Sequence, residues 1–338
     1  MADPTVTLTL NPAGPKYVID EQCNMPSITA IAKLENVPPD SRAPVQYQWS
    51  VTVEFRGGAA CPHSVSRATN HAPITELNGT TQYRIPFTQV RGGDLTVKLS
   101  VVYGNITLHA EIKGTITGTN PALSSLQNDA PKKAGFRKLM RLESALRQFY
   151  SNGCPLFSQD NLGGVGICQL TNPAPSDDEV WSWKANLAGG VSLWNQKERV
   201  ARGYPAHVRA SKEFTDQVKA FNDSRAAAAA AAAKAAGKPA PDTPAIKVIV
   251  PEYTADQLER DTLRGFNGYA GGLHEYRLKV DANGILVVTI DPTGQQGTAQ
   301  WEQLTAADRN AFYDKAGIAA NRRGDPNYVN DVEAKDSF

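Results

Sequence analysis

The chain has 338 residues, enough for two domains or for one domain with large insertions. Charged residues make up 20% and the formal net charge is +1, so neither a nucleic-acid partner nor a strongly acidic partner is expected. Apolar residues reach 41%, which excludes wholesale disorder. No stretch has the roughly twenty apolar residues that span a bilayer, so we expect a soluble protein without membrane insertion.

The cysteines and the N-terminus together bear on where the protein works. The opening MADPTVTLTL lacks the basic and apolar regions of a secretory signal. Each expected domain contains one pair of cysteines, Cys23 with Cys61 and Cys154 with Cys168. This even split is compatible with two local disulfides. The alternative is four buried thiols in a cytosolic protein. Disulfides would indicate an oxidising workplace such as the periplasm, which this chain would reach from the cytoplasm by a dedicated export route.

Residues 1–118 are predicted to be all-β. Apolar and polar residues alternate in three runs, Trp49–Phe55, Leu95–Val101 and Ile106–Ile112, and the last two are separated by the hairpin signal Gly104-Asn105. Earlier and later runs bring the count to about seven strands: Val6–Leu10, Ile28–Leu34 and Gln82–Phe87. We expect a small antiparallel sandwich of immunoglobulin-like architecture, a fold that implies no chemistry and leaves docking, adhesion or spacing open.

Histidines and cysteines in this region do not make a metal site. Cys61, His63 and His71 lie in a loop that contains Pro and Ser but lacks a convincing ligand set. We therefore predict neither a metal nor another cofactor.

Residues 119–130 are predicted to form a linker, and residues 131–338 a mainly α-helical domain. Helical periodicity predicts six segments: Lys132–Tyr150, Asp178–Gln196, a helix from Ser211 into the Ala tract, Thr254–Gly265, Ala306–Ala316 and Asn327–Ala334. Tyr276–Val280 and Ile285–Ile290 are predicted to pair as a hairpin. The Ala/Pro-rich sequence at about 222–252 is predicted to be an inserted surface arm.

One carboxylate stands on the apolar side of the first predicted helix. Phe136, Leu139, Met140 and Leu146 lie seven, four, three and three residues from Glu143, which places them on its helical face. Burial disfavours the ionised carboxylate, so the pKa of Glu143 should be raised, as a general acid near neutral pH requires. The alternative is a structural Glu at the edge of the stripe that reaches water.

Five segments in order resemble the lysozyme-like family of soluble lytic transglycosylases and goose-type lysozymes. Leu142-Glu143-Ser144 resembles the Glu-Ser motif, and Gly166–Leu170 (GICQL) resembles the Gly-Leu-Met-Gln motif. Asn186–Gly190 (NLAGG) is similar to a helix start that lies behind the cleft. Gly265–Gly268 (GFNG) resembles the Tyr-Asn-Ala/Gly-Gly motif, and Asp325–Val332 resembles the closing Pro-x-Tyr-Val-x-x-Val segment. The resemblance covers roughly 130–200 and 254–335.

The resemblance implies a lysozyme-like fold and a cleft that binds peptidoglycan glycan strands. Glu143 would be the catalytic acid, and Asp160, six residues before Gly166, would help to place a water. Gln169 and Asn267 would hydrogen-bond the N-acetyl sugars, and Ser144 would orient the catalytic Glu rather than contact sugar.

The sequence departs from the family at two motif positions. Cys168 replaces the usual Met, and Phe266 replaces a Tyr whose hydroxyl is implied to contact the catalytic carboxyl. Tyr269 or Tyr276 would then have to supply that hydroxyl.

These features predict a muramidase or lytic transglycosylase that cuts the glycan strands of peptidoglycan. Two settings fit: a toxin exported by a bacterial injection system such as type VI secretion, with a cognate immunity protein, or a wall-opening component of a phage particle. The exported toxin is favoured; it would act in the periplasm of a target bacterium, and its β domain would dock to the injection system. The alternative class is a degenerate binding or structural module.

Overall fold

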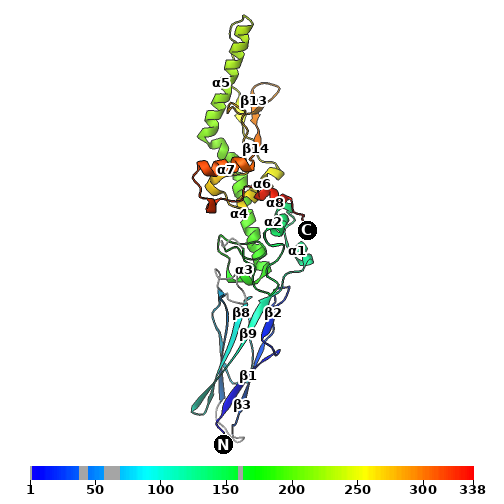
Figure 1. The fold of residues 1–338 in the computed structure, drawn as a ribbon, viewed down its shortest axis with the longest axis vertical. Coiled ribbons are helices and arrows are strands. Elements are labelled where there is room, and N and C mark those ends of the chain that lie inside the picture. The colour runs from blue at the N-terminus through cyan, green and yellow to red at the C-terminus, as the bar shows by residue number, and fades with distance from the viewer. Residues whose placement is uncertain (1, 38–44, 57–68, 159–162) are drawn as a thin grey trace. The chain divides into compact units, whose positions relative to one another are not determined.

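The chain has a mixed α/β, multidomain structure (Figure 1). The computed structural model describes residues 2–37, 45–56, 69–158 and 163–338. Within those ranges the chain forms several β sheets and eight α-helices. Residue contacts divide the chain into two compact units, which we call unit 1 and unit 2. Unit 1 comprises Met1–Lys132, Met140–Val191 and Phe338, and unit 2 comprises Lys133–Leu139 and Ser192–Ser337.

Unit 1 is built on two sheets. The larger sheet has the order β2-β9-β8-β4-β5 with β6 also paired to β4, and the smaller sheet has the order β1-β3-β7. The strands are β1 Thr5–Asn11, β2 Lys16–Ile19, β3 Thr29–Glu35, β4 Val45–Phe55, β5 Thr69–Asn70, β6 Ile74–Asn78, β7 Gln82–Arg84, β8 Gly93–Tyr103 and β9 Ile106–Gly118.

Period-two alternation explains the longest strands. Along β4 and β8 every second side chain is buried, and the predicted hairpin is confirmed by the pairing of Tyr103 with Ile106. The six predicted strands correspond to β1, β3, β4, β7, β8 and β9. The expectation of a purely antiparallel arrangement is wrong, because β2 pairs with β9 in parallel. Strands β2, β5 and β6 carry too few alternating apolar residues to have been recognised.

The core of unit 1 includes residues that follow the β strands in sequence. Phe149, Phe157, Val165 and Trp181 belong to the same buried cluster as the inward side chains of both sheets. The Trp181 ring meets that of Phe55 edge-on, with centroids 5.1 Å apart. A Cβ at Gly118, at the end of β9, would lie 2.2 Å from the Phe149 ring, so that glycine permits the close approach. Residues 140–191 therefore group with the sheets.

Four helices follow: α1 Leu123–Asp129, α2 Ala134–Ser144, α3 Asp177–Trp181 and α4 Trp183–Ala210. The segment 119–130, predicted as a linker, contains α1. The predicted helix to Tyr150 ends instead at Ser144, since Ala145 and Leu146 both have positive φ. The predicted helix from Asp178 is divided into α3 and α4 by the extended backbone of Ser182.

Unit 2 is organised around α5, Lys212–Ala235, whose first turn is capped by the Ser211 side chain. Phe214 and Phe221 of α5 share a buried cluster with Ile246, Val248 and other residues of the following strands. The predicted Ala/Pro-rich arm is therefore anchored at its base. Asn222 confirms this, because its side chain accepts from Ile246 N at 2.8 Å and donates to Ile246 O at 3.2 Å.

Two small sheets and three helices complete unit 2. One sheet has the order β10-β13-β12, the other joins β11 to β14, and α6 to α8 correspond to the last three predicted helices. The bounds are β10 Lys247–Ile249, α6 Ala255–Phe266, β11 Tyr276–Leu278, β12 Val288–Ile290, β13 Gln296–Ala299, β14 Trp301–Gln303, α7 Ala306–Lys315 and α8 Tyr328–Glu333. The predicted hairpin survives only as a bridge between Val280 and Leu286, because β11 and β12 pair with other strands.

No described helix combines the length and the apolar character that crossing a membrane requires.

The cysteines pair differently from the prediction. Cys154 is disulfide-bonded, whereas Cys23 and Cys168 are free thiols, so neither Cys23–Cys61 nor Cys154–Cys168 forms. Cys61 lies outside the described residues. Spacing alone could not reveal this, because a disulfide depends on which β carbons the fold brings together.

We predict two free thiols of very different reactivity. Alkylation of the unreduced, denatured chain followed by peptide mass spectrometry should modify Cys23 and Cys168 and leave Cys154 unmodified. In the native protein Cys168 should react far more slowly than Cys23, because burial and the Glu143 carboxylate raise the pKa of its thiol. Equal native rates, or alkylation of Cys154, would contradict the assignment.

Candidate functional site

Glu143 lies in the last turn of α2. The predicted apolar face is present in part: Phe136, Leu139 and Met140 are fully buried, but Leu146 lies beyond the helix end. Glu143 itself is half-buried. Its carboxylate is close enough to Cys168 to contribute, after burial, to the raised pKa of that thiol. The first two motifs of the resemblance are therefore neighbours in unit 1.

Ser144 ties the end of α2 to the second motif. Its buried hydroxyl lies 2.8 Å from Ile167 O and 3.0 Å from Met140 O, so both possible acceptors are backbone carbonyls. A hydroxyl held in this way positions its neighbour Glu143 and is turned toward the protein. This supports the orienting role of Ser144 over the contact with substrate.

The Gly-rich turn is held by two buried amide side chains, Gln148 and Asn186. Gln148 Oε1 accepts from Ile167 N at 3.0 Å, and Asn186 Oδ1 accepts from Cys168 N at 2.9 Å. The NH₂ groups of both side chains donate to nearby backbone carbonyls; for example, Asn186 Nδ2 donates to Val165 O. Gly166 has a φ of 72°, and a Cβ there would lie within 2.6 Å of both amides.

Sequence reasoning missed Gln148. Its only signal in the sequence is a polar residue directly before the aromatic pair Phe149-Tyr150. Such a residue must find hydrogen-bond partners when it is buried. Asn186 was noted as part of a motif behind the cleft, and it lies within α4, behind the turn.

Gln169 is the least buried residue of the turn after Gly166. It has a φ of 47°, and its amide donates to Gly166 O at 2.8 Å. The same side chain would have to leave or share that bond to reach a sugar, so its contact with substrate remains a prediction. Asp160 lies outside the described residues, and its role also remains a prediction.

The other predicted contacts belong to unit 2. The half-buried Phe266 ring lies 5.9 Å from that of Trp194, which in turn meets Phe136 edge-on. The side-chain carbonyl of Asn267 accepts a long 3.4 Å bond from Arg264. The predicted site residues are thus divided between the two units, Glu143, Ser144 and Gln169 in one and Phe266, Asn267 and Tyr276 in the other.

Neither candidate tyrosine presents a freely exposed hydroxyl. The Tyr269 hydroxyl donates to Asp261 O at 2.9 Å. Tyr276 is 6% exposed, and burial raises the pKa of its hydroxyl. Tyr276 also lies close to Arg260, Asp256 and Glu333, whose charges act on its pKa.

A buried ionic network stands beneath the Phe266-Asn267 segment. Arg264 Nε lies 3.2 Å from Glu275, and Arg309 forms the second ion pair of the same carboxylate. Both guanidinium groups also donate to the carbonyl of Pro326. This network fixes the end of α6 against the segment that precedes α8. No sequence motif predicted it.

Among the described residues no cluster of three or more His, Cys, Asp or Glu side chains is arranged to hold a metal ion. Cys61 and His63 fall outside those residues, and His71 is buried in unit 1.

The chain matches no protein-family model and no curated protein sequence. Its function is therefore inferred from the motif residues and from their local geometry.

We predict that Asn186→Ala destabilises the protein by at least about 1 kcal/mol. The substitution leaves the buried Cys168 N without the Asn186 acceptor, at a cost of about 1–3 kcal/mol, whereas Val165 O still accepts from Leu170 N. Urea denaturation followed by circular dichroism measures the change. Asn195→Ala is the matched control, because Asn195 is an exposed residue of the same helix. Equal effects of the two substitutions would contradict the bracing role.

Proposed function

We propose that the chain is a peptidoglycan glycosidase that cleaves between N-acetylmuramic acid and N-acetylglucosamine, as a muramidase or a lytic transglycosylase. In this proposal the helical part has a lysozyme-like fold and the β sheets form an immunoglobulin-like sandwich. The observation that carries the proposal is local. Glu143 lies in the last turn of α2, beside the Gly-rich turn. The hydroxyl of its neighbour Ser144 donates to Ile167 O of that turn. Two motifs that resemble the same family are thereby joined by a hydrogen bond.

Glycosidic cleavage requires a proton on the leaving oxygen and stabilisation of an oxocarbenium-like centre. Glu143 would deliver the proton from a half-buried position whose backbone is fixed by Ser144. The acetamido group of the substrate would stabilise the centre, so a second protein carboxylate is not needed for that step. Glu143 would then act as a base. It would accept the proton either of the sugar 6-hydroxyl, which closes an anhydro ring, or of a water placed by Asp160.

The disulfide at Cys154 supports an oxidising compartment, because such bonds persist outside the cytosol. We propose that the enzyme acts in the periplasm of a target bacterium as an exported toxin, for example of a type VI secretion system. Its partners would be glycan strands, an immunity protein and, through the β sheets, a component of the injection system. A phage particle is the alternative setting.

We predict that Glu143→Gln lowers cleavage of purified peptidoglycan by at least about 100-fold, because the amide cannot donate the catalytic proton. Turbidity of a sacculus suspension measures the rate. The control is Glu111→Gln, which alters an exposed glutamate of β9 and should clear at the wild-type rate. If the wild type and Glu143→Gln clear the sacculus suspension equally fast, Glu143 is not the catalytic acid. Binding without clearing by the wild type would indicate a degenerate module.

The products should separate the two reactions. Mass spectrometry of released muropeptides shows anhydro ends after transglycosylation and reducing ends after hydrolysis. If Asp160 places the attacking water, Asp160→Asn should reduce the share of reducing ends and leave anhydro ends. An undiminished share of reducing ends would remove Asp160 from the mechanism.

A further inference from the structure

Unit 2 contains a cavity that the predicted glycosidase site does not use. It has a volume of about 440 Å³, within the range of small-molecule sites. Its walls come from the end of α4, the beginning of α5 and the chain from Gly272 through β11 to Val280. None of the residues predicted to contact substrate lines it.

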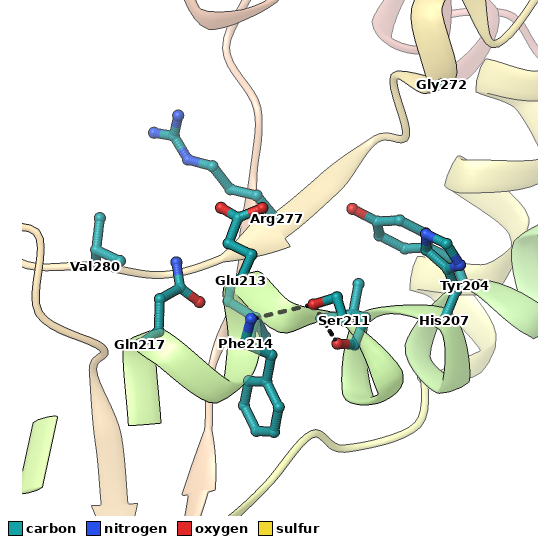
Figure 2. Close-up of a pocket in the computed structure, with 11 residues that line it drawn as sticks. Tyr204, His207, Ser211, Glu213, Phe214, Gln217, Gly272, Arg277 and Val280 are labelled. Carbon is teal, nitrogen blue, oxygen red and sulfur yellow. Dashed lines mark hydrogen bonds between the residues drawn. The ribbon is translucent and has the colours of Figure 1, made fainter. Parts of the chain in front are cut away.

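Four polar side chains on the cavity wall have no hydrogen-bond partner among the described residues. They are Tyr204 and His207 from α4 and Glu213 and Gln217 from α5. Figure 2 shows Glu213 and Gln217 projecting from α5 toward the strand that carries Arg277, with the Tyr204 and His207 rings on the other side. His207 and Glu213 are exposed and Tyr204 and Gln217 half-buried, so these side chains are available to a ligand that enters the cavity.

Tyr204 is held in place from behind. Its ring stacks on His274 with centroids 3.7 Å apart, and His274 Nδ1 lies 2.8 Å from the buried Asp261 carboxylate. Burial, with Asp261 and Glu213 nearby, raises the pKa of Tyr204 to about 12, so its hydroxyl remains a donor at neutral pH. The cavity therefore has a preorganised aromatic wall.

The charges around the cavity disfavour an anionic ligand. Arg277 is already bound by Glu302 at 3.0 Å and by Asp308 at 3.2 Å. Lys212 is paired with Asp216, whereas Glu213 has no ion pair within the described part of the chain. The uncompensated charge is thus negative, and a phosphate or carboxylate would be repelled.

The balance of donors and acceptors separates a neutral ligand from a cation. Tyr204, His207 and Gln217 can each donate as well as accept, and only Glu213 is restricted to accepting. All four could accept from a cation, but hydroxyl and acetamido groups would use their donors as well as their acceptors. Val280 and the Tyr204 ring supply apolar surface for the carbon face of a ring (Figure 2).

We propose that this cavity is a second saccharide site, which binds an N-acetylated sugar unit of a glycan strand. The choice of glycan among neutral, hydroxyl-rich ligands rests on the proposed function. When an enzyme binds its polymer at a second site, the effective concentration of the polymer at the cleavage site rises. The cavity would therefore increase the affinity for long strands more than for short ones.

The test measures binding in the full chain carrying Glu143→Gln, so that binding does not depend on cleavage. The probes are chitotetraose in solution, by titration calorimetry, and denuded sacculi, by co-sedimentation. Adding Glu213→Ala and Gln217→Ala should weaken binding of sacculi by about tenfold, because two hydrogen-bonding groups are lost. His207→Ala should weaken it in the same direction.

The matched control is Lys219→Ala with Asp223→Ala, which removes an exposed ion pair farther along α5 and should leave binding unchanged. Unchanged binding by the Glu213/Gln217 variant, or an equal loss in the control, overturns the proposal. Competition by spermidine but not by chitotetraose would show a cation site and would also overturn it. A failure of the glycosidase assignment is distinguishable, because it would appear in the turbidity assay, where Glu143→Gln would clear sacculi as fast as the wild type.

Discussion

The two buried amides of Gln148 and Asn186 are the constraint on which the candidate site depends. Backbone bridges satisfy Val165, but Ile167 N and Cys168 N have side-chain acceptors instead, and buried N–H and C=O groups must be paired. An amide side chain both donates and accepts, so each of these residues can hold two segments at once. Both donate to Glu179 O, which brings the residues after α2, the turn and α3 together. Ser144 then has a fixed carbonyl to bind, and the place of Glu143 follows.

Much of the local structure could be predicted from the sequence, for identifiable reasons. The alternation in β4 and β8 is set by sheets that bury one face, and the starts of α5 and α6 are marked by the capping residues Ser211 and Thr254. The end of α2 could not be predicted in the same way. Ala145 and Leu146 favour helix, but they adopt positive φ while their N–H groups bond back to Arg141 O and Met140 O of α2.

The candidate site could be predicted only where the motif carried the chemistry. Glu143 and the Gly166 turn were found because their residue types are unusual for their surroundings. Gln148, Arg264 and Glu275 were missed, since a buried polar residue reveals its role only when its partners are known. Arg264 of α6 and Arg309 of α7 both meet Glu275, which precedes β11, and no local spacing encodes that meeting. Glu213 and Gln217 were overlooked because they begin a helix that otherwise reads as low-complexity alanine.

The shared core of unit 1 has a consequence for how such a chain can be recombined. Gene fusion that replaced only residues 1–118 would strip the cover from Phe149 and Trp181, whose rings lie against Gly118 and Phe55. The β sheets and the segment from Met140 to Val191 are therefore expected to be inherited as one block. An exchange at residue 119 would break this block, so the bracing of the Gly-rich turn stays with its original sheets.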